Sequence, residues 1–249
     1  MNTVLITGCS SGFGLDTAKY FLAQGWKVIA TMRTPQPDLF PASDRLTVLP
    51  LDVTDDQSVR AAVEAAGPID VLVNNAGIGW LNALEGTPID MTRAIFETNT
   101  IGTIRMVQAV LPQFRARRAG LIINVTSSVT MKPLPLLSVY SASKAAVNAF
   151  TESLALELES WGIAVRIVLP GAAPGTSFGS TALSRLEENG GFPEAYGEYA
   201  GGVIAAMRQP GGLRTTSGDV AEAVWRIAND PSSVSMQTPA GADAVALAS

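Results

Sequence analysis

The sequence predicts a single α/β domain built around a buried parallel sheet. Short β-branched and apolar runs alternate with longer stretches of helical apolar spacing, and the first run leads into a glycine-rich turn and a helix. The chain has 249 residues, of which 47% are apolar, and this length and composition suit one large core. The sequence shows no internal repeat and no linker, so we expect one domain over residues 1–249.

The first unit of the chain has the order strand, glycine-rich turn, helix. Residues 3–7 form the strand, the turn reads Gly8-Cys-Ser-Ser-Gly-Phe-Gly14, and helical spacing covers residues 15–24. The first glycine permits the turn, the second lets the backbone approach a phosphate at the helix N-terminus, and the third allows close helix packing. An isolated glycine-rich turn is only a turn, but its flanking elements favour a cofactor site. We assign this site to Gly8, Ser10, Ser11, Gly12, Phe13 and Gly14, with Cys9 as a small filler.

The end of the second predicted strand, residues 26–32, indicates which nucleotide is preferred. An acidic side chain there would bond the adenosine ribose and favour NAD, but the chain has Met32 followed by Arg33. A guanidinium group can pair with a 2′-phosphate, so Arg33 predicts NADP(H). NAD(H) is the alternative, with Arg33 then an ordinary solvated arginine. Three prolines in residues 34–45 leave the next crossover helix short or absent.

Two further strand ends are assigned to the cofactor. The third strand, residues 46–51, runs into Asp52, which either bonds the adenine amino group or caps the next turn. A helix over residues 55–66 and a fourth strand over 70–73 follow, and that strand closes with Asn74-Asn-Ala-Gly77. Small residues there leave space along a cofactor, although Asn-held turns also occur in ordinary loops. The residues assigned here are Asp52, Val53, Asn75, Ala76 and Gly77.

A long helical region over residues 89–117 contains Asn99 near its middle. Asparagine is mildly unfavourable inside a helix, so its presence calls for a reason. One reason is a local kink that frees a backbone carbonyl for a water molecule. The alternative is an asparagine on the helix surface.

Three residues after the fifth strand, residues 121–125, suggest proton-transfer chemistry. Ser127 stands at the strand end, and Tyr140 and Lys144 lie one helical turn apart, on the same helix face. A free phenol titrates near ~10, and a neighbouring lysine cation lowers that pKa toward the operating pH. The serine hydroxyl can hold the oxygen that gains or loses the proton. A Tyr-x-x-x-Lys pair by itself also occurs on solvated helix faces.

The remaining elements complete the sheet and add a lid. We expect a helix over residues 140–161 and a strand over 163–169. Pro170 and Gly171 then break the chain where the nicotinamide end of a cofactor would lie. Residues 172–218 are weakly periodic and rich in glycine, which predicts loops and short helices that form a substrate lid.

The C-terminal part is predicted to hold one more helix and one more strand. Asp219 is expected to cap a helix that ends at Asn229. A strand is expected over residues 234–237, and residues 239–249 are expected to form a tail.

Composition excludes several classes of function. The formal charge is −5 and no large cationic cluster occurs, which argues against nucleic-acid binding. The absence of histidine excludes histidine-based triads, and a single cysteine excludes an internal disulfide and fits a reducing compartment. The first strand starts too early to leave room for a signal peptide, and no apolar run is long enough to span a membrane. We therefore expect a cytoplasmic protein.

Taken together, these motifs resemble those of the short-chain dehydrogenase/reductases over nearly the whole chain. The matching segments are Thr7-Gly-Cys-Ser-Ser-Gly-Phe-Gly14, Asn74-Asn-Ala-Gly77, Asn99, Ser127 thirteen residues before Tyr140, Tyr140-Ser-Ala-Ser-Lys144 and Pro170-Gly171. The resemblance implies a Rossmann-type, doubly wound parallel sheet of about seven strands in the order 3-2-1-4-5-6-7, with helices on both faces.

The resemblance also implies the chemistry. A hydride would pass between the nicotinamide and a carbonyl carbon, and Tyr140 would give or take the proton. Lys144 would lower the pKa of Tyr140 and hold the nicotinamide ribose, Ser127 would position the substrate oxygen, and Asn99 would hold a relay water. No metal is implied.

Some features depart from the family pattern or narrow it. A threonine that bonds the cofactor amide is often found five residues after the proline, but here Gly175 occupies that position and Thr176 would need a loop shift. The tail lacks the Gly-Gly ending common in tetramers, which favours a homodimer through the helices that hold Asn99 and Tyr140. Residues 30–33 and Pro239-Ala-Gly-Ala-Asp243 resemble the hydroxysteroid and retinol dehydrogenase branch, without indicating the substrate.

The sequence therefore predicts an NADP(H)-dependent carbonyl reductase or alcohol dehydrogenase. Aromatic residues in the lid, with Trp80 and Met131, suggest a small apolar substrate, unless they simply pack the lid. A non-catalytic nucleotide-binding regulatory or scaffold protein is the alternative, but such proteins often lose the Tyr or Lys. A lyase on the same scaffold, such as a halohydrin dehalogenase, would lack the lysine and the glycine-rich motif.

Overall fold

Seven parallel strands form one sheet in the order β3-β2-β1-β4-β5-β6-β7, which confirms the predicted topology. The computed structural model describes residues 2–209 and 211–248. The strands are β1 (Thr3–Thr7), β2 (Lys27–Met32), β3 (Leu46–Pro50), β4 (Val71–Asn74), β5 (Gly120–Val125), β6 (Ile163–Pro170) and β7 (Gln237–Ala240).

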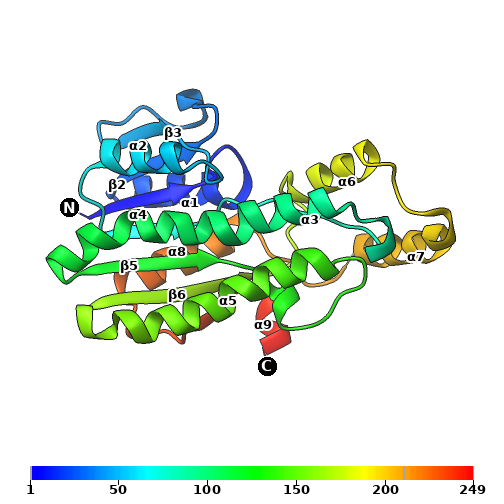
Figure 1. Ribbon diagram of the computed structural model, residues 1–249. Coiled ribbons are helices and arrows are strands. Elements are labelled where there is room, and N and C mark those ends of the chain that lie inside the picture. Colours follow the sequence, from blue (N-terminus) through cyan, green and yellow to red (C-terminus); the bar gives the residue numbers. More distant parts are fainter. Residues whose placement is uncertain (1, 210, 249) are drawn as a thin grey trace.

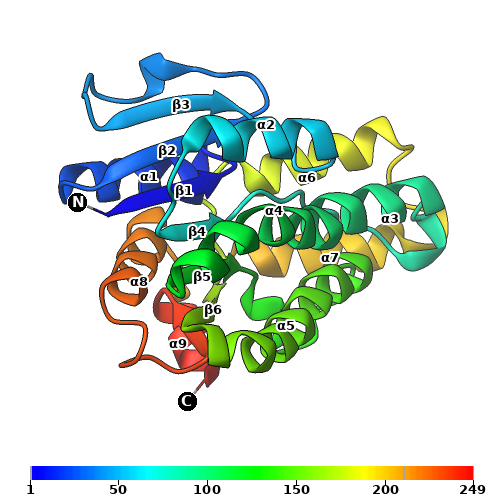
Figure 2. The ribbon, with the colours of Figure 1, turned by 60° about the vertical axis from the view of Figure 1, so that its left-hand side comes forward.

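Helices cover both faces of this sheet (Figures 1 and 2). α1 (Gly12–Ala23) and α8 (Ser217–Asn229) pack on one face, and α2 (Asp56–Ala66), α4 (Gly102–Arg117) and α5 (Ser138–Leu158) pack on the other. The alternation of strand side chains explains the two cores, because Val4 and Ile6 point to the first face and Leu5 to the second. Single helical turns occur at η1 (Pro37–Leu39), η2 (Leu84–Gly86), η4 (Ser128–Thr130) and η5 (Glu159–Trp161).

The long helical region is continuous but changes its winding in the middle. α3 (Ile89–Phe96) passes through a π-helical turn, η3 (Glu97–Ile101), into α4. Asn99 lies in this turn, so the helix changes its winding at the residue where the sequence suggested a kink. Just after it, a Cβ on Gly102 would lie only 2.8 Å from Cγ2 of Val53, which brings the helix against the loop after β3.

The lid stands beyond the carboxyl end of the sheet (Figure 1). It contains α6 (Phe178–Glu188), η6 (Glu194–Tyr196) and α7 (Gly197–Arg208), as the prediction of short helices between loops requires. Its inner side forms a small hydrophobic cluster with the loops after β4 and β5, centred on Leu81, Leu136 and Ala200. The lid therefore has a packed base of its own.

Several helix boundaries differ from the prediction, and α5, predicted over residues 140–161, runs from Ser138 to Leu158. α1 begins at Gly12, three residues before the first residue of the predicted helix. α8 is capped by Thr216, and the prediction that Asp219 is the cap was wrong. The Asp219 carboxylate instead accepts the backbone N–H of Thr216 while the Thr216 hydroxyl accepts that of Asp219, a reciprocal capping box.

The C-terminal prediction was also wrong. The last strand is Gln237–Ala240, three residues later than predicted, and α9 (Ala242–Ala248) replaces most of the expected tail. β7 contains Pro239, which lacks an N–H, and it is an edge strand, where such a residue is tolerated. None of the helices in residues 2–209 and 211–248 is long and apolar enough to cross a lipid bilayer.

Candidate active site

Ser127, Tyr140 and Lys144 come together at the carboxyl end of β5. α5 begins at Ser138, so Tyr140 and Lys144 lie in its first two turns, and both side chains are buried. The phenol of Tyr140 forms a hydrogen bond with Ser127. The Lys144 ammonium donates to the carbonyl of Val125, at 3.1 Å. The structure thus places the predicted hydroxyl, phenol and amine in one site.

The pKa of Tyr140 is shifted in the direction opposite to the one predicted. Burial raises it to about 12, and the hydrogen bond with Ser127 opposes the rise only in part. The ring of Phe178 in the lid contributes to this burial, with its centroid 5.7 Å from that of Tyr140. The phenol is therefore protonated at neutral pH in this structure.

Lys144 is a buried cation with capacity for a ligand. Burial lowers its pKa to about 8. A Cβ on Gly77 would lie 3.4 Å from Nζ of Lys144 and 3.2 Å from Oδ1 of Asn99, so the glycine keeps space open beside both groups. Within the described chain, the bond to Val125 is the one hydrogen bond that Nζ forms, which leaves two of its three N–H groups for a ligand.

The burial of the Lys144 ammonium should lower the stability of the native protein. The folded pKa of about 8 lies below the ordinary 10.5, a difference worth roughly 3 kcal/mol. Because the Lys144 amine binds its proton more tightly in the unfolded chain, the free energy of unfolding should rise as the pH rises from about 8 to 10.5. Below about pH 8 the native protein carries the full cost of burying the ammonium. Lys144→Met has no ionisable group there and should lose this pH dependence.

Denaturant unfolding of both proteins at pH 7 and pH 10 checks this prediction. We expect the free energy of unfolding of the native protein to gain up to about 3 kcal/mol relative to Lys144→Met over that interval. Comparing the two proteins removes the contributions of the other titrating groups, which they share. A difference that stays constant with pH would show that the Lys144 ammonium remains hydrated.

Asn99 is buried in the π-helical turn, which rules out the surface alternative. Its Oδ1 accepts the N–H of Ile78 at 2.8 Å, and its Nδ2 donates to the carbonyl of Ile78 and to Oγ of Ser143. Ser143 in turn donates to the carbonyl of Tyr140, at 2.7 Å. The Asn99 carbonyl accepts the hydroxyl of Thr103. Asn99 therefore joins the loop after β4 to the start of α5, and the relay water stays a prediction.

The glycine-rich turn is tied to the loop after β4. The side-chain amide of Asn75 donates to the carbonyls of Thr7 and Gly8, at 2.9 and 3.2 Å, and the N–H groups of Asn75 and Ala76 donate to the Thr7 hydroxyl. Gly12 has a φ of +56°, a conformation that favours glycine. Side chains of the two predicted motifs thus build a single rigid edge.

The start of α1 fits the phosphates of a dinucleotide. Its N-cap, Ser11, makes no side-chain capping bond, and the first turn contains no acidic residue. The first N–H groups of the helix therefore still need acceptors, and the helix dipole favours an anion. Ser10 is exposed and Phe13 half-buried beside this end. Cys9 is a filler, as predicted, because its thiol is buried with a pKa raised to about 12.

The predicted adenosine end of the site contains Asp52, for which the sequence left two roles open. Oδ1 of Asp52 accepts the N–H and the hydroxyl of Thr54, so the turn alternative is what the structure has. The carbonyl of Val53, which is itself buried, accepts a hydrogen bond from Arg105. The adenine contacts of Asp52 and Val53 stay predictions.

Arg33 is exposed beside this end, and its charge reaches the lid. The pKa of Asp52 is lowered chiefly by its bond with the Thr54 N–H and further by the charge of Arg33. The pKa of Arg185 in α6 is lowered by burial and by the same charge. Arg185 donates to the carbonyl of Gly79, at 3.5 Å. Sequence reasoning missed Arg185, because no local pattern brings α6 to β2.

The first residues of the lid lie across the glycine-rich turn. Oγ of Ser177 donates to Oγ of Ser11 at 3.1 Å, and the Thr176 side chain lies 3.5 Å from the position of a Cβ on Gly12. The Thr176 hydroxyl donates to the carbonyl of Ala173. Thr176 therefore sits over the cofactor turn, and its predicted bond to the cofactor stays a prediction.

Trp80 does not line a substrate wall. Its side chain is 2% exposed, its indole N–H donates to the hydroxyl of Thr87, and it packs against Ile95 and Val139. The aromatic residue that reaches the Tyr140 ring is Phe178.

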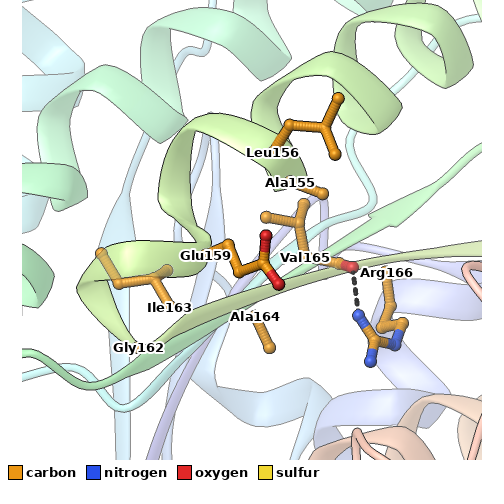
Figure 3. A pocket seen from close by; sticks show the side chains of 8 residues that line it. All are labelled: Ala155, Leu156, Glu159, Gly162, Ile163, Ala164, Val165 and Arg166. Atoms are coloured by element: carbon orange, nitrogen blue, oxygen red, sulfur yellow. Dashed lines mark hydrogen bonds between the residues drawn. The ribbon is translucent and has the colours of Figure 1, made fainter.

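A separate hollow lies at the other end of α5 (Figure 3). It is formed by the last turns of α5 and the start of β6, and Arg166 at its rim donates to the carbonyl of Val165. None of the predicted catalytic residues lines it. The lining residues are Ala155, Leu156, Glu159, Gly162, Ile163, Ala164, Val165 and Arg166.

Residues 2–184 match the family model described as short chain dehydrogenase. The chain belongs to the short-chain dehydrogenase family. An uncharacterised oxidoreductase of Bacillus subtilis is 36% identical over 248 residues, which cover 95% of this chain and 88% of that protein. Retinol dehydrogenase 8 of Bos taurus is 41% identical over 181 residues, or 68% of this chain. That match spans 58% of the bovine protein, less than two thirds of its length.

Solved structures of related dehydrogenases and reductases agree with this family assignment. A short-chain dehydrogenase from Streptomyces avermitilis superposes with a TM-score of 0.84 at 33% identity, covering 99% of this chain and 90% of the other. The closed form of a serine dehydrogenase complexed with NADP+ gives 0.79 at 29% identity, covering 95% and 93%. A 3-ketoacyl-(acyl-carrier-protein) reductase from Brucella melitensis complexed with NADH gives 0.78 at 28%, covering 96% of each.

Proposed function

We propose that this short-chain dehydrogenase interconverts a carbonyl and an alcohol with NADP(H), using Tyr140 as the acid and base. The observation that carries the proposal is the buried phenol of Tyr140, hydrogen-bonded to Ser127, with the Lys144 ammonium one helical turn away. These groups lie beside an uncapped helix N-terminus that suits a dinucleotide.

Each residue has a distinct part in the reaction. A nicotinamide cofactor, when bound, supplies or accepts the hydride. Tyr140 gives its proton to the carbonyl oxygen in reduction and takes it back in oxidation, while the Ser127 hydroxyl holds that oxygen. Lys144 stabilises the phenolate that forms, and its remaining N–H groups hold the nicotinamide ribose. The raised pKa of Tyr140 means that its phenol carries the proton that reduction of a carbonyl needs.

The cofactor is held along the carboxyl edge of the sheet, from the adenosine end at β2 to the nicotinamide end at β6. Gly8 to Gly14 bind the pyrophosphate, and Asn75 to Gly77 leave room for the ribose. Arg33, assisted by Arg185 from the lid, pairs with the 2′-phosphate, and Met32 leaves the ribose without the carboxylate that favours NAD. A complex with NADP+ and one with NADH among the related structures support a nicotinamide cofactor.

Nicotinamide fluorescence during titration with NADPH and NADH tests the proposal first, followed by a screen of small apolar ketones and aldehydes. Tight NADPH binding together with carbonyl-dependent oxidation of NADPH is the expected result. Binding of neither nucleotide would favour the non-catalytic alternative. The apolar cluster at the base of the lid supports an apolar substrate. The homodimer stays a prediction, which light scattering of the purified protein can check.

Arg33 provides a direct test of nucleotide choice. The double variant Met32→Asp and Arg33→Ser should weaken NADPH binding by about 10- to 100-fold, because a charge-assisted bond contributes ~1.5–3 kcal/mol. It should leave or improve NADH binding, since the new carboxylate can bond the ribose. Arg60→Ser, on the exposed side of α2, removes the same charge as a matched control. An unchanged ratio of the two dissociation constants would reject Arg33 as the phosphate ligand.

A further inference from the structure

The lid leaves the sheet and returns to it at one point. It departs after Pro170 at the end of β6 and comes back at Thr215, one residue before the cap of α8. The N–H of Thr215 donates to the carbonyl of Ala172, at 3.0 Å, and the N–H of Gly171 donates to the hydroxyl of Thr215, also at 3.0 Å. The two ends of the lid therefore form a hinge.

One carboxylate joins these two ends. Asp243 lies in the first turn of α9, directly after β7. Its Oδ2 accepts the N–H of Ala172 and its Oδ1 accepts the hydroxyl of Thr215, each at 2.6 Å. Hydrogen bonds to an ionised acceptor are shorter than neutral ones and roughly twice as strong, and both distances are as short as this class of bond requires. Asp243 thus binds the segment that leaves the sheet, at Ala172, and the segment that returns to it, at Thr215.

The chain makes room for this carboxylate with two glycines. A Cβ on Gly171 would overlap the carboxylate of Asp243, and a Cβ on Gly241 would overlap the side chain of Thr215. Gly241 also has a φ of +95°, which lets the chain turn from β7 into α9. The segment Pro239-Ala-Gly-Ala-Asp243 therefore packs closely against the two ends of the lid. Its composition alone does not suggest this role.

The hinge is linked to the proposed catalytic residues in two ways, through the pairing of β5 with β6 and through the start of α6. The N–H of Thr126, next to Ser127, donates to the carbonyl of Val168 in β6, two residues before Pro170. Six residues after Ala172, Phe178 begins α6 and its ring contacts that of Tyr140. A displacement of the hinge would consequently move the residue that covers Tyr140.

We propose that Asp243 is a positioning residue for the reaction, because its carboxylate fixes the lid hinge and through it the placement of Phe178 over Tyr140. The inference deepens the proposed function and rests on it for the kinetic part alone. Asp243 acts through Ala172 and Thr215, with no contact to the reacting atoms required. A residue that merely stabilised α9 would affect unfolding of the whole domain and leave the lid as ordered as before.

Hydrogen exchange of the free protein tests the hinge without turnover. Asp243→Ala should speed amide exchange over residues 172–209 by at least about 10-fold, while exchange in the central strands β1, β4 and β5 stays unchanged. Asp243→Asn keeps one acceptor for Ala172 and loses the charge. Its exchange rates in the lid should therefore fall between those of the native protein and those of Asp243→Ala. Asp230→Asn is the matched control, since Asp230 also accepts turn hydrogen bonds, from Ser232 and Ser233, away from the lid.

Steady-state kinetics then separate positioning from stability. We expect Asp243→Ala to raise the KM for the carbonyl substrate by about 10-fold, with kcat reduced less. A variant with a lower midpoint of thermal unfolding but with native exchange in the lid and a native KM would overturn the proposal. If no carbonyl substrate turns over but the lid of Asp243→Ala still exchanges faster, the proposed function fails and the hinge stands. If the enzyme turns over and Asp243→Ala leaves lid exchange unchanged, the hinge fails and the proposed function stands.

Discussion

Replacing Tyr140 by Phe should lower kcat by at least about 1000-fold while changing the affinity for NADPH by less than about threefold. General acid–base catalysis by one side chain contributes about 10²- to 10⁴-fold. The phenylalanine ring keeps the contact with Phe178, so the packing of the lid survives. What is lost is the proton route and the hydrogen bond with Ser127.

The measurement pairs turnover with binding. Oxidation of NADPH in the presence of a carbonyl substrate gives kcat, and nicotinamide fluorescence gives the dissociation constant of NADPH for the same sample. Tyr199→Phe is a matched control, because Tyr199 is 56% exposed on α7 and removal of its hydroxyl should change neither value. Retention of a tenth or more of kcat by Tyr140→Phe would refute Tyr140 as the acid.

The parts of the fold that follow from short-range patterns could be predicted from the sequence. Buried parallel strands are near-continuous apolar runs, so residues 3–7 and 163–169 are recognisable alone. Asn99 stood out because an asparagine is unfavourable inside a helix, and it lies in the π-helical turn. The last strand was placed too early because Pro239 argues against any strand but an edge strand, and edge position is a property of the whole sheet.

The features that arise from tertiary contacts could not be predicted in the same way. The tyrosine–lysine spacing suggests a lowered pKa for Tyr140, but burial of the phenol raises it. That burial involves Phe178, 38 residues away in a segment whose glycine-rich sequence carries no periodic signal. Arg185 likewise comes near Arg33 only through the folded path of the lid, and Asp243 reaches the lid hinge only through the folded path of β7. Local chemistry thus indicated the candidate reacting groups, while their environment depended on distant segments.

Gly14→Ala should lower the free energy of unfolding by about 3 kcal/mol and abolish measurable NADPH binding, since overpacking a rigid site costs ~1–3 kcal/mol or more. A methyl group there would overlap the carbonyl of Gly8 and the side-chain amide of Asn75. Neither can retreat easily, because the first is backbone and the second is bonded to Thr7 and Gly8. The start of α1 would have to move away from β1 and take with it the N–H groups that we propose bind the phosphates.

Gly201→Ala in α7 is the control for this substitution. No atom lies within 4 Å of the added Cβ, so the change should stabilise the helix by about 0.5–1 kcal/mol and leave NADPH binding intact. Denaturant unfolding and fluorescence titration of both variants give the comparison. Loss of NADPH binding at native stability would make Gly14 a ligand contact alone. Loss of both together would mean that the third glycine of the turn holds α1 against β1 and β4, and that the cofactor site exists only while this packing is kept.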